Sequence, residues 1–117
     1  MKKIYYLSTC DTCKKIIKSW EPIEDCILQD IKNEAITVAQ LEEMQQLSGS
    51  YEALFSKRAR LYKERNLKEK SLTESDIKAL ILEEYTFLKR PVLLLENKIF
   101  IGNSKKVVEA ATIALHS

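Results

Sequence analysis

The chain has 117 residues, a length typical of a single domain. Charged residues make up 31% of it and nearly cancel, leaving a formal net charge of +2, so it lacks the basic excess of a dedicated nucleic-acid-binding protein. No apolar run approaches the roughly 18 residues that a transmembrane helix needs, and the N-terminal apolar stretch is too short for a signal peptide. We therefore expect one cytoplasmic domain over residues 1–117, with reduced thiols and no direct contact with nucleic acid or membrane.

Two cysteines, Cys10 and Cys13, lie between an apolar stretch at 3–7, which predicts a buried strand, and an amphipathic stretch at 14–20, which predicts a helix. In a helix the two thiols would share a face, close enough to form a disulfide. Cys10 would lie near the N-cap, where free N–H groups and the positive charge of Lys14 favour a thiolate. The pattern predicts Cys10 as the nucleophile of thiol–disulfide exchange and Cys13 as the resolving thiol.

Two simpler interpretations of this CxxC motif remain: half of a zinc site, or two small buried residues. Zinc needs four ligands, and the chain offers only Cys26 and His116 besides the pair. We interpret Cys26 as a buried apolar residue and expect no metal site. Asp11 and Thr12 are expected to cap the first helix.

The rest of the chain continues in the same coarse pattern. A strand is predicted at 26–31, a helix from Thr37 until Ser48-Gly49-Ser50, further helix from Tyr51, a helix from Thr73 to Leu88, strands at 92–95 and 99–101, and a last helix after Gly102-Asn103-Ser104. Capping-box pairs mark two of these helix starts, Thr37 with Gln40 and Thr73 with Asp76. The continuous apolar run at 92–95 indicates a strand buried on both faces.

Without its helical middle part, at about 37–88, the chain is a βαβ unit followed by a ββα unit. The first pair of strands is expected to be parallel and the second pair an antiparallel hairpin. The sequence therefore predicts an α/β protein with a thioredoxin-like fold and a helical insert between the second and third strands.

The insert carries many basic residues. They are Lys57, Arg58, Arg60, Lys63, Arg65, Lys68 and Lys70. Such a run is commonly a solvated helix face, and the alternative is an anion site or a partner surface.

Three segments resemble the arsenate-reductase-like (ArsC/Spx/YffB) family. The run from Ser8 to Lys15, Ser-Thr-Cys-Asp-Thr-Cys-Lys-Lys, resembles its active-site loop. Arg90-Pro91-Val92-Leu93-Leu94 resembles its Arg-Pro strand, and Ile101-Gly102-Asn103 resembles the segment after its hairpin. The resemblance covers essentially the whole chain, insert included, and the combination is specific to the family.

The resemblance implies roles for individual residues. Cys10 matches the cysteine that attacks the oxyanion, and Arg90 matches the arginine before the proline. Arg58 is the nearest candidate for the insert arginine, whereas Ile101 stands where a third arginine is expected, which weakens the case for arsenate. The implied catalytic set is Cys10, Cys13 and Arg90, and the implied substrate-binding set is Arg58, Lys14, Thr12 and Pro91. A cis Arg90–Pro91 bond facing the active cysteine is also implied.

Two functions follow from the resemblance. The first is a thiol-dependent oxidoreductase that reduces arsenate or a disulfide or glutathionylated substrate, with no bound cofactor and with glutathione or a thioredoxin/glutaredoxin system as electron donor. Arsenate reductases of this branch have a serine-like residue in place of Cys13, so the second thiol is a departure. The second function is an Spx-type redox-switched regulator that binds the RNA polymerase α subunit, through a surface whose glycine matches Gly49 or Ser50.

Overall fold

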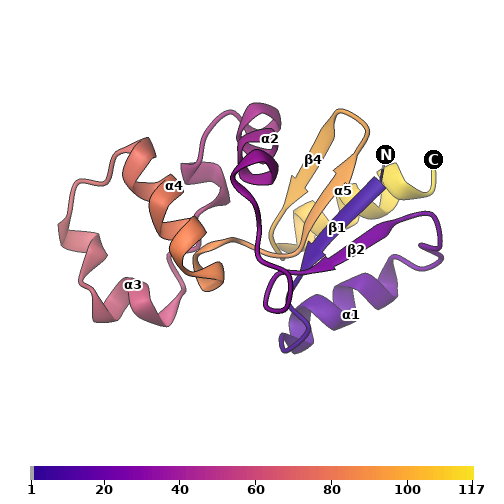
Figure 1. Cartoon of the computed structure of the whole chain (residues 1–117). Helices are drawn as coiled ribbons and strands as arrows, with labels where there is room; N and C mark the ends of the chain where they lie inside the picture. The colour runs from indigo at the N-terminus through magenta and orange to yellow at the C-terminus, as the bar shows by residue number, and fades with distance from the viewer. Residues whose placement is uncertain (1) are drawn as a thin grey trace. The chain divides into compact units, whose positions relative to one another are not determined.

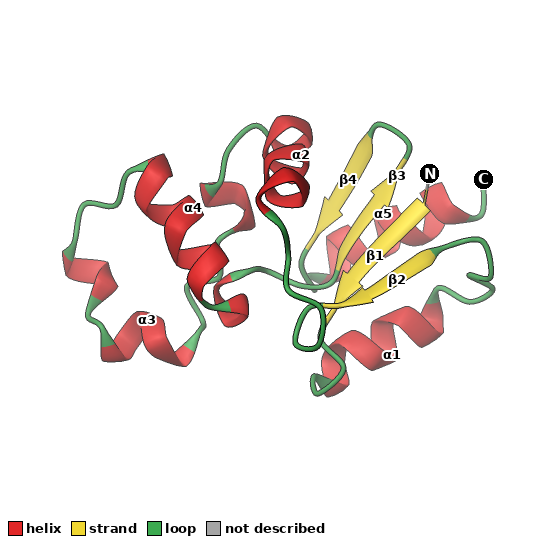
Figure 2. Cartoon of the chain, viewed as in Figure 1, coloured by secondary structure: helices red, strands yellow, loops and turns green. Residues whose placement is uncertain are grey.

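The computed structural model of the chain describes residues 2–117 and divides them into two compact units (Figure 1). The first unit runs up to Ala35 and resumes at Arg90–Ser117, and the second is Ile36–Lys89. Figure 2 shows strands and flanking helices in the first unit, and helices joined by loops over residues 36–89. No helix within residues 2–117 is long and apolar enough to cross a membrane.

The first unit is built around one sheet. Its elements are β1 (Lys2–Tyr6), α1 (Asp11–Ser19), β2 (Ile27–Asp30), β3 (Val92–Leu95), β4 (Lys98–Ile101) and α5 (Lys105–Leu115). The strand order is β2-β1-β3-β4. β1 is parallel to β2 and antiparallel to β3, which pairs with β4 as an antiparallel hairpin. The predicted parallel pairing of the first two strands and the predicted antiparallel hairpin of the last two are confirmed.

One core fixes these elements against each other. Buried side chains of β1, α1, β3 and α5 form it: Ile4, Ile16, Trp20, Leu93, Leu95 and Ala111. All four residues of β3 are buried, as its continuous apolar run predicted. Of the two adjacent tyrosines in β1, Tyr5 is the fully buried one, at 1% exposed. The ends of β1 and α1 are therefore anchored by long-range packing, which fixes the loop between them.

The second unit consists of short helices. They are α2 (Val38–Ser48), α3 (Arg60–Glu64) and α4 (Glu74–Glu83), with 3₁₀ turns η1 (Glu52–Leu54), η2 (Leu67–Glu69) and η3 (Tyr85–Phe87). The predicted capping boxes at Thr37 and Thr73 are both present, each with its reciprocal pair of hydrogen bonds. α2 ends at Gly49, whose φ of 94° is the left-handed conformation that glycine adopts readily.

Two boundaries in this unit differ from the sequence prediction. The stretch after Tyr51 was predicted to continue as helix, and it is broken into η1, α3 and η2. Asn66, with φ 53°, ends one piece, and Phe55 packs on the rings of Tyr62 and Phe87 instead of along one helical stripe. α4 ends at Glu83 and not at Leu88, because Glu84 turns to an extended conformation.

The second strand is also shorter than the predicted 26–31. The ladder with β1 covers only Ile27–Asp30, and the chain turns immediately after it. Turn hydrogen bonds from the Asn33 and Glu34 amides to the Asp30 carbonyl, 3.1 and 2.8 Å long, end the strand.

Candidate active site

Cys10 lies in the loop between the first strand and the first helix. A tight turn joins β1 to α1, closed by a 3.0 Å hydrogen bond from the Cys10 amide to the Leu7 carbonyl. Cys10 is extended, with φ −99° and ψ 111°, and its own carbonyl accepts from the Lys14 amide at 3.1 Å. Cys10 is therefore the N-cap residue of α1, as predicted.

The predicted capping of α1 by Asp11 or Thr12 is wrong. The helix begins one residue earlier than that prediction needs, so both residues already lie in its first turn. Cys10 occupies the cap position and, as a thiol, makes no side-chain cap hydrogen bond. The first turn of α1 therefore has no side-chain oxygen as a cap, and the backbone of Thr12 and Cys13 acts on the Cys10 sulfur instead.

The pKa of the Cys10 thiol is lowered. Partial burial acts to raise it, but the backbone N–H and the thiol of Cys13 favour the charged sulfur, as do the positive charge of Arg90 and the backbone of Thr12. These favourable contacts outweigh desolvation, so the Cys10 thiolate forms at lower pH than that of an ordinary cysteine.

Cys13 has the opposite chemistry. Its side chain is only 1% exposed, and burial raises its pKa to about 11 despite a hydrogen bond from the Leu7 backbone. The nearby charge of Cys10 acts in the same direction as burial. The two thiols interact directly, and only one of them is readily ionised, which is the asymmetry that a nucleophile and a resolving thiol require.

Arg90 and Pro91 precede β3 and belong to the same unit as the two cysteines. The Arg90–Pro91 peptide bond is cis, which confirms the prediction. The charge of Arg90 acts to lower the pKa of both Cys10 and Cys13, so the guanidinium lies within electrostatic reach of both sulfurs. Pro91 is buried, and its carbonyl accepts a 2.9 Å hydrogen bond from the amide of Gly102, which links the start of β3 to the end of β4.

The remaining predicted substrate-binding residues have different surroundings. Thr12 and Lys14 are exposed in the first turns of α1, and the Lys14 ammonium lies 3.8 Å from the Asp11 carboxylate. Arg58 is an exposed residue of the second unit, in the turn before α3. Its role at the site of Cys10 stays a prediction.

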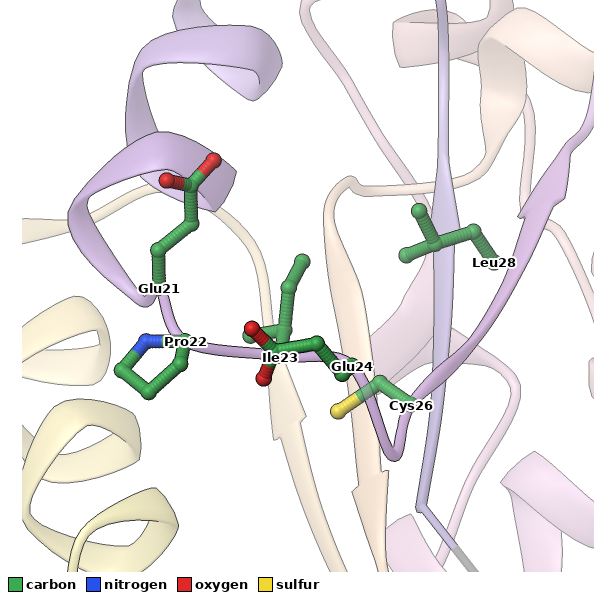
Figure 3. Close-up of a pocket in the computed structure, with 6 residues that line it drawn as sticks. All are labelled: Glu21, Pro22, Ile23, Glu24, Cys26 and Leu28. Carbon is green, nitrogen blue, oxygen red and sulfur yellow. The ribbon is translucent and has the colours of Figure 1, made fainter.

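The third cysteine belongs to another place in the first unit. Cys26 precedes β2 and lines an open hollow of about 680 Å³ with Glu21, Pro22, Ile23, Glu24 and Leu28 (Figure 3). Burial and the neighbouring Asp25 raise the pKa of Cys26. Because β1 and β2 are parallel, the start of β2 and the end of β1 lie at opposite ends of the pair, and Cys26 is separated from Cys10 by the length of the strands.

A metal centre would require a set of ligand side chains among the described residues. Within residues 2–117, no group of three or more His, Cys, Asp or Glu side chains is placed to hold an ion. His116 ends α5 and is exposed.

Sequence analysis missed Asp30. Its carboxylate accepts a hydrogen bond from the Ser8 amide, two residues before Cys10. An acidic residue at the end of a strand is a weak signal by itself. Only the register that pairs Tyr6 with Asp30 brings it to this loop.

The topology and the cysteine at the first strand–helix junction define a thioredoxin-like fold with a helical insert, as predicted. The structure superposes on an arsenate reductase from Vibrio cholerae with a TM-score of 0.77 at 20% identity, covering 92% of this chain and 95% of that one. It also superposes on an ArsC family related protein from Bacteroides fragilis with a TM-score of 0.75 at 25% identity, covering 93% of this chain and 95% of that one.

The family follows from the sequence. The model of the ArsC family matches residues 5–111, and the chain belongs to this family. It is also similar to the global transcriptional regulator Spx 2 of Bacillus cereus, with 28% identity over an alignment of 109 residues that covers 90% of this chain and 82% of the regulator.

Proposed function

We propose that the protein is a cytoplasmic thiol-dependent oxidoreductase whose Cys10 attacks an oxidised substrate and whose Cys13 resolves the intermediate. The observation that carries the proposal is the pKa asymmetry: Cys10 below its ordinary value, Cys13 raised to about 11, and the two thiols in direct interaction. A thiolate is the attacking species in exchange, and a buried neutral thiol one helical turn away is protected until the intermediate forms.

The proposed reaction has two steps. The Cys10 thiolate attacks one sulfur of a substrate disulfide, forming a mixed disulfide and releasing the other sulfur as a thiolate that takes up a proton. Cys13 then gives up its proton and attacks the Cys10 sulfur, which releases the second substrate thiol and leaves a Cys10–Cys13 disulfide. Two electrons pass to the substrate, and two molecules of glutathione or a thioredoxin/glutaredoxin system return them.

Arsenate would follow the same route. Cys10 would displace one oxygen as water to form an arsenic–sulfur bond, and attack by Cys13 would release arsenite with the same disulfide. Arg90 is proposed to hold the anionic group, with Lys14, Arg58, Thr12 and the backbone at Pro91 as further contacts.

Disulfide formation tests the proposal directly. Diamide should convert the wild type into a species lighter by two hydrogen atoms, measured by intact mass, and Cys10→Ser and Cys13→Ser should not form it. Cys26→Ser is the matched control and should oxidise like the wild type, because Cys26 lies at the other end of the β1–β2 pair. Loss of the species in Cys26→Ser would refute the pairing.

Turnover then identifies the substrate class. Arsenate and hydroxyethyl disulfide would each be offered with glutathione, glutaredoxin or thioredoxin as donor. Reduction of either that disappears in Cys10→Ser supports the enzyme. If the disulfide forms in the wild type but no combination of substrate and donor is turned over, the redox-active cysteine pair stands and the oxidoreductase is refuted.

A second candidate function is a redox-switched regulator, favoured by the similarity to Spx 2. In this function the Cys10–Cys13 disulfide switches contact with the RNA polymerase α subunit, and the exposed basic residues around Arg58 form the partner surface. A pull-down with purified α subunit, performed with reduced and diamide-treated protein, tests it. Binding that depends on the redox state, without thiol turnover, supports the regulator, and turnover without binding supports the enzyme.

A further inference from the structure

Asp30, the last residue of β2, accepts hydrogen bonds from several donors with one carboxylate. Its Oδ1 accepts from the Ser8 amide and from the Lys32 amide, each at 3.2 Å, and its Oδ2 accepts from the Asn33 side chain at 2.7 Å. Lys32 and Asn33 belong to the turn that follows β2, whereas Ser8 is 22 residues away in sequence. The Ser8 contact is therefore the one that joins two distant segments.

This contact continues the link between the two chain segments beyond the last main-chain hydrogen bond of the β1–β2 ladder. The β1–β2 ladder ends with Tyr6 opposite Asp30, and the Ile31 amide donates to the Tyr6 carbonyl at 2.9 Å. Past this point the chain of β1 leaves the sheet. The Asp30 carboxylate accepts a hydrogen bond from this departing segment at Ser8, halfway between the end of β1 and Cys10.

Ser8 lies inside the turn that leads to Cys10. The turn closed by the Cys10 amide and the Leu7 carbonyl has Ser8 as its second residue, whose own amide takes no part in closing it. The backbone of the preceding residue, Leu7, acts to lower the pKa of the Cys13 thiol, so Leu7 lies beside Cys13. The loop is thus next to Cys13 at Leu7 and is bound by Asp30 at Ser8.

We propose that Asp30 is a positioning residue for the Cys10 nucleophile: its carboxylate orders the turn from Leu7 to Cys10 and so holds the Cys10 sulfur against the amides of α1 and the guanidinium of Arg90. This inference rests on the proposed function, since it concerns the same thiol. It assigns a role to an acidic residue that the proposed reaction does not use.

The effect works through position and not through charge. A carboxylate near a thiol disfavours the thiolate, whereas the groups that act on the Cys10 sulfur are Cys13, Arg90 and Thr12. Hydrogen bonding to Ser8, ahead of a smaller opposing desolvation, lowers the pKa of Asp30, so the carboxylate is ionised and able to accept at neutral pH.

The test measures Cys10 reactivity without needing a substrate. Iodoacetamide alkylation of Cys10, followed by peptide mass mapping in a Cys26→Ser background, is recorded from pH 5 to pH 9 for Asp30→Ala and Asp30→Asn. Asp30→Ala should slow alkylation near pH 6.5 by about threefold to tenfold, because the misplaced sulfur loses part of its stabilisation. Asp30→Asn should stay within about twofold of the background protein, since its amide oxygen still accepts from Ser8.

Asp25→Ala is the matched control. Asp25 lies just before β2 and binds the side chain of Lys2 at 2.7 Å, so it is an ion-paired aspartate of the same unit at the opposite end of the strand. Its removal should leave the Cys10 profile unchanged. Equal slowing in Asp25→Ala and Asp30→Ala would mean a general loss of stability and would overturn the inference, as would an unchanged profile in folded Asp30→Ala.

One further variant keeps the inference testable if Asp30→Ala does not fold. Asp30→Glu keeps the charge and displaces the carboxylate by one methylene, so it should alkylate more slowly than Asp30→Asn. Faster alkylation of Asp30→Glu than of Asp30→Asn would overturn the inference, because the position of the accepting oxygen would then not matter. An ordinary Cys10 pKa in the background protein would instead refute the proposed function, so the two failures are distinguishable.

Discussion

The two units of the chain differ in the interactions that the sequence uses to define their secondary structure. In the first unit, Ile4, Leu93 and Ala111 come from distant parts of the sequence and share one core. In the second, helices begin at the local capping boxes of Thr37 and Thr73. The first unit also contains the helix whose cap position is occupied by a thiol with no cap hydrogen bond. A long-range core therefore accompanies a reactive thiol at a helix start that has no side-chain cap.

The largest expected effect is in the core of the first unit. Leu93 is 0% exposed, and Leu93→Ala should lower the free energy of unfolding by about 2–5 kcal/mol, from lost burial and the cavity left behind. Urea denaturation followed by circular dichroism measures it. Ile113, at 72% exposed in α5, is the control, and Ile113→Ala should change stability by less than about 0.5 kcal/mol. Similar losses in both variants would mean that this core does not hold the unit together.

The next effect concerns pH and the buried thiol. Cys13 keeps its proton to about pH 11 when folded, whereas in the unfolded chain it ionises near its ordinary value. Between about pH 8.5 and 11 the unfolded state therefore binds fewer protons, and stability falls as pH rises, by roughly 3 kcal/mol over the window.

Comparison with Cys13→Ala isolates this contribution. Denaturation under reducing conditions at pH 7 and pH 10 should show a larger loss for the wild type than for Cys13→Ala, because the variant lacks the thiol and retains the other alkaline groups. Parallel losses in the two proteins would contradict the raised pKa.

A smaller effect is expected at Arg90. Arg90→Ala should raise the pKa of Cys10, since the guanidinium is one of the groups that favour its thiolate. Alkylation of Cys10 near pH 6.5 should slow by about threefold to tenfold. Arg90→Lys should restore part of the rate and less of the anion affinity, because lysine lacks the planar fork. Lys98→Ala, an exposed charge of β4, is the control, and a rate as slow as that of Arg90→Ala would point to net charge alone.

The smallest effects compare the helix starts of the two units. Thr73→Ala removes a capping box from α4 and should cost about 1 kcal/mol. Cys10→Ser places a good cap residue at the start of α1 and should stabilise the protein by up to about 1 kcal/mol while abolishing its redox reactivity. Thermal denaturation under reducing conditions measures both. A Cys10→Ser protein that is less stable than the wild type would show that the thiol already supports the helix.

Local patterns predicted most of the fold. The apolar run of β3, the capping boxes and Gly49 each determine their structure from neighbouring residues. The break-up of the chain after Tyr51 was not predictable in this way, because Phe55 is held by the rings of Tyr62 and Phe87 and not by a helical stripe. Helical spacing alone favours one long helix there.

The candidate site also has one part that local sequence predicts and another that depends on strand pairing. The position of Cys10 at the start of α1 follows from the sequence, because a strand, a turn and a helix surround it. The balance of its pKa depends on Arg90, which reaches it only through the pairing of β1 with β3. The contact of Asp30 depends on the register of β1 with β2. A residue whose role depends on strand register cannot be identified from the residues next to it in the sequence.

Trp20 gives the molecule a built-in optical probe. It is the single tryptophan of the chain, 1% exposed in the core of the first unit, and it follows the last residue of α1. Its fluorescence therefore reports the state of the sheet unit alone, whereas circular dichroism also records the helices of residues 36–89. If the emission maximum and the ellipticity change at different urea concentrations, the two units melt separately. Coincident curves would mean that the helix bearing Cys10 and the inserted helices unfold as one cooperative body.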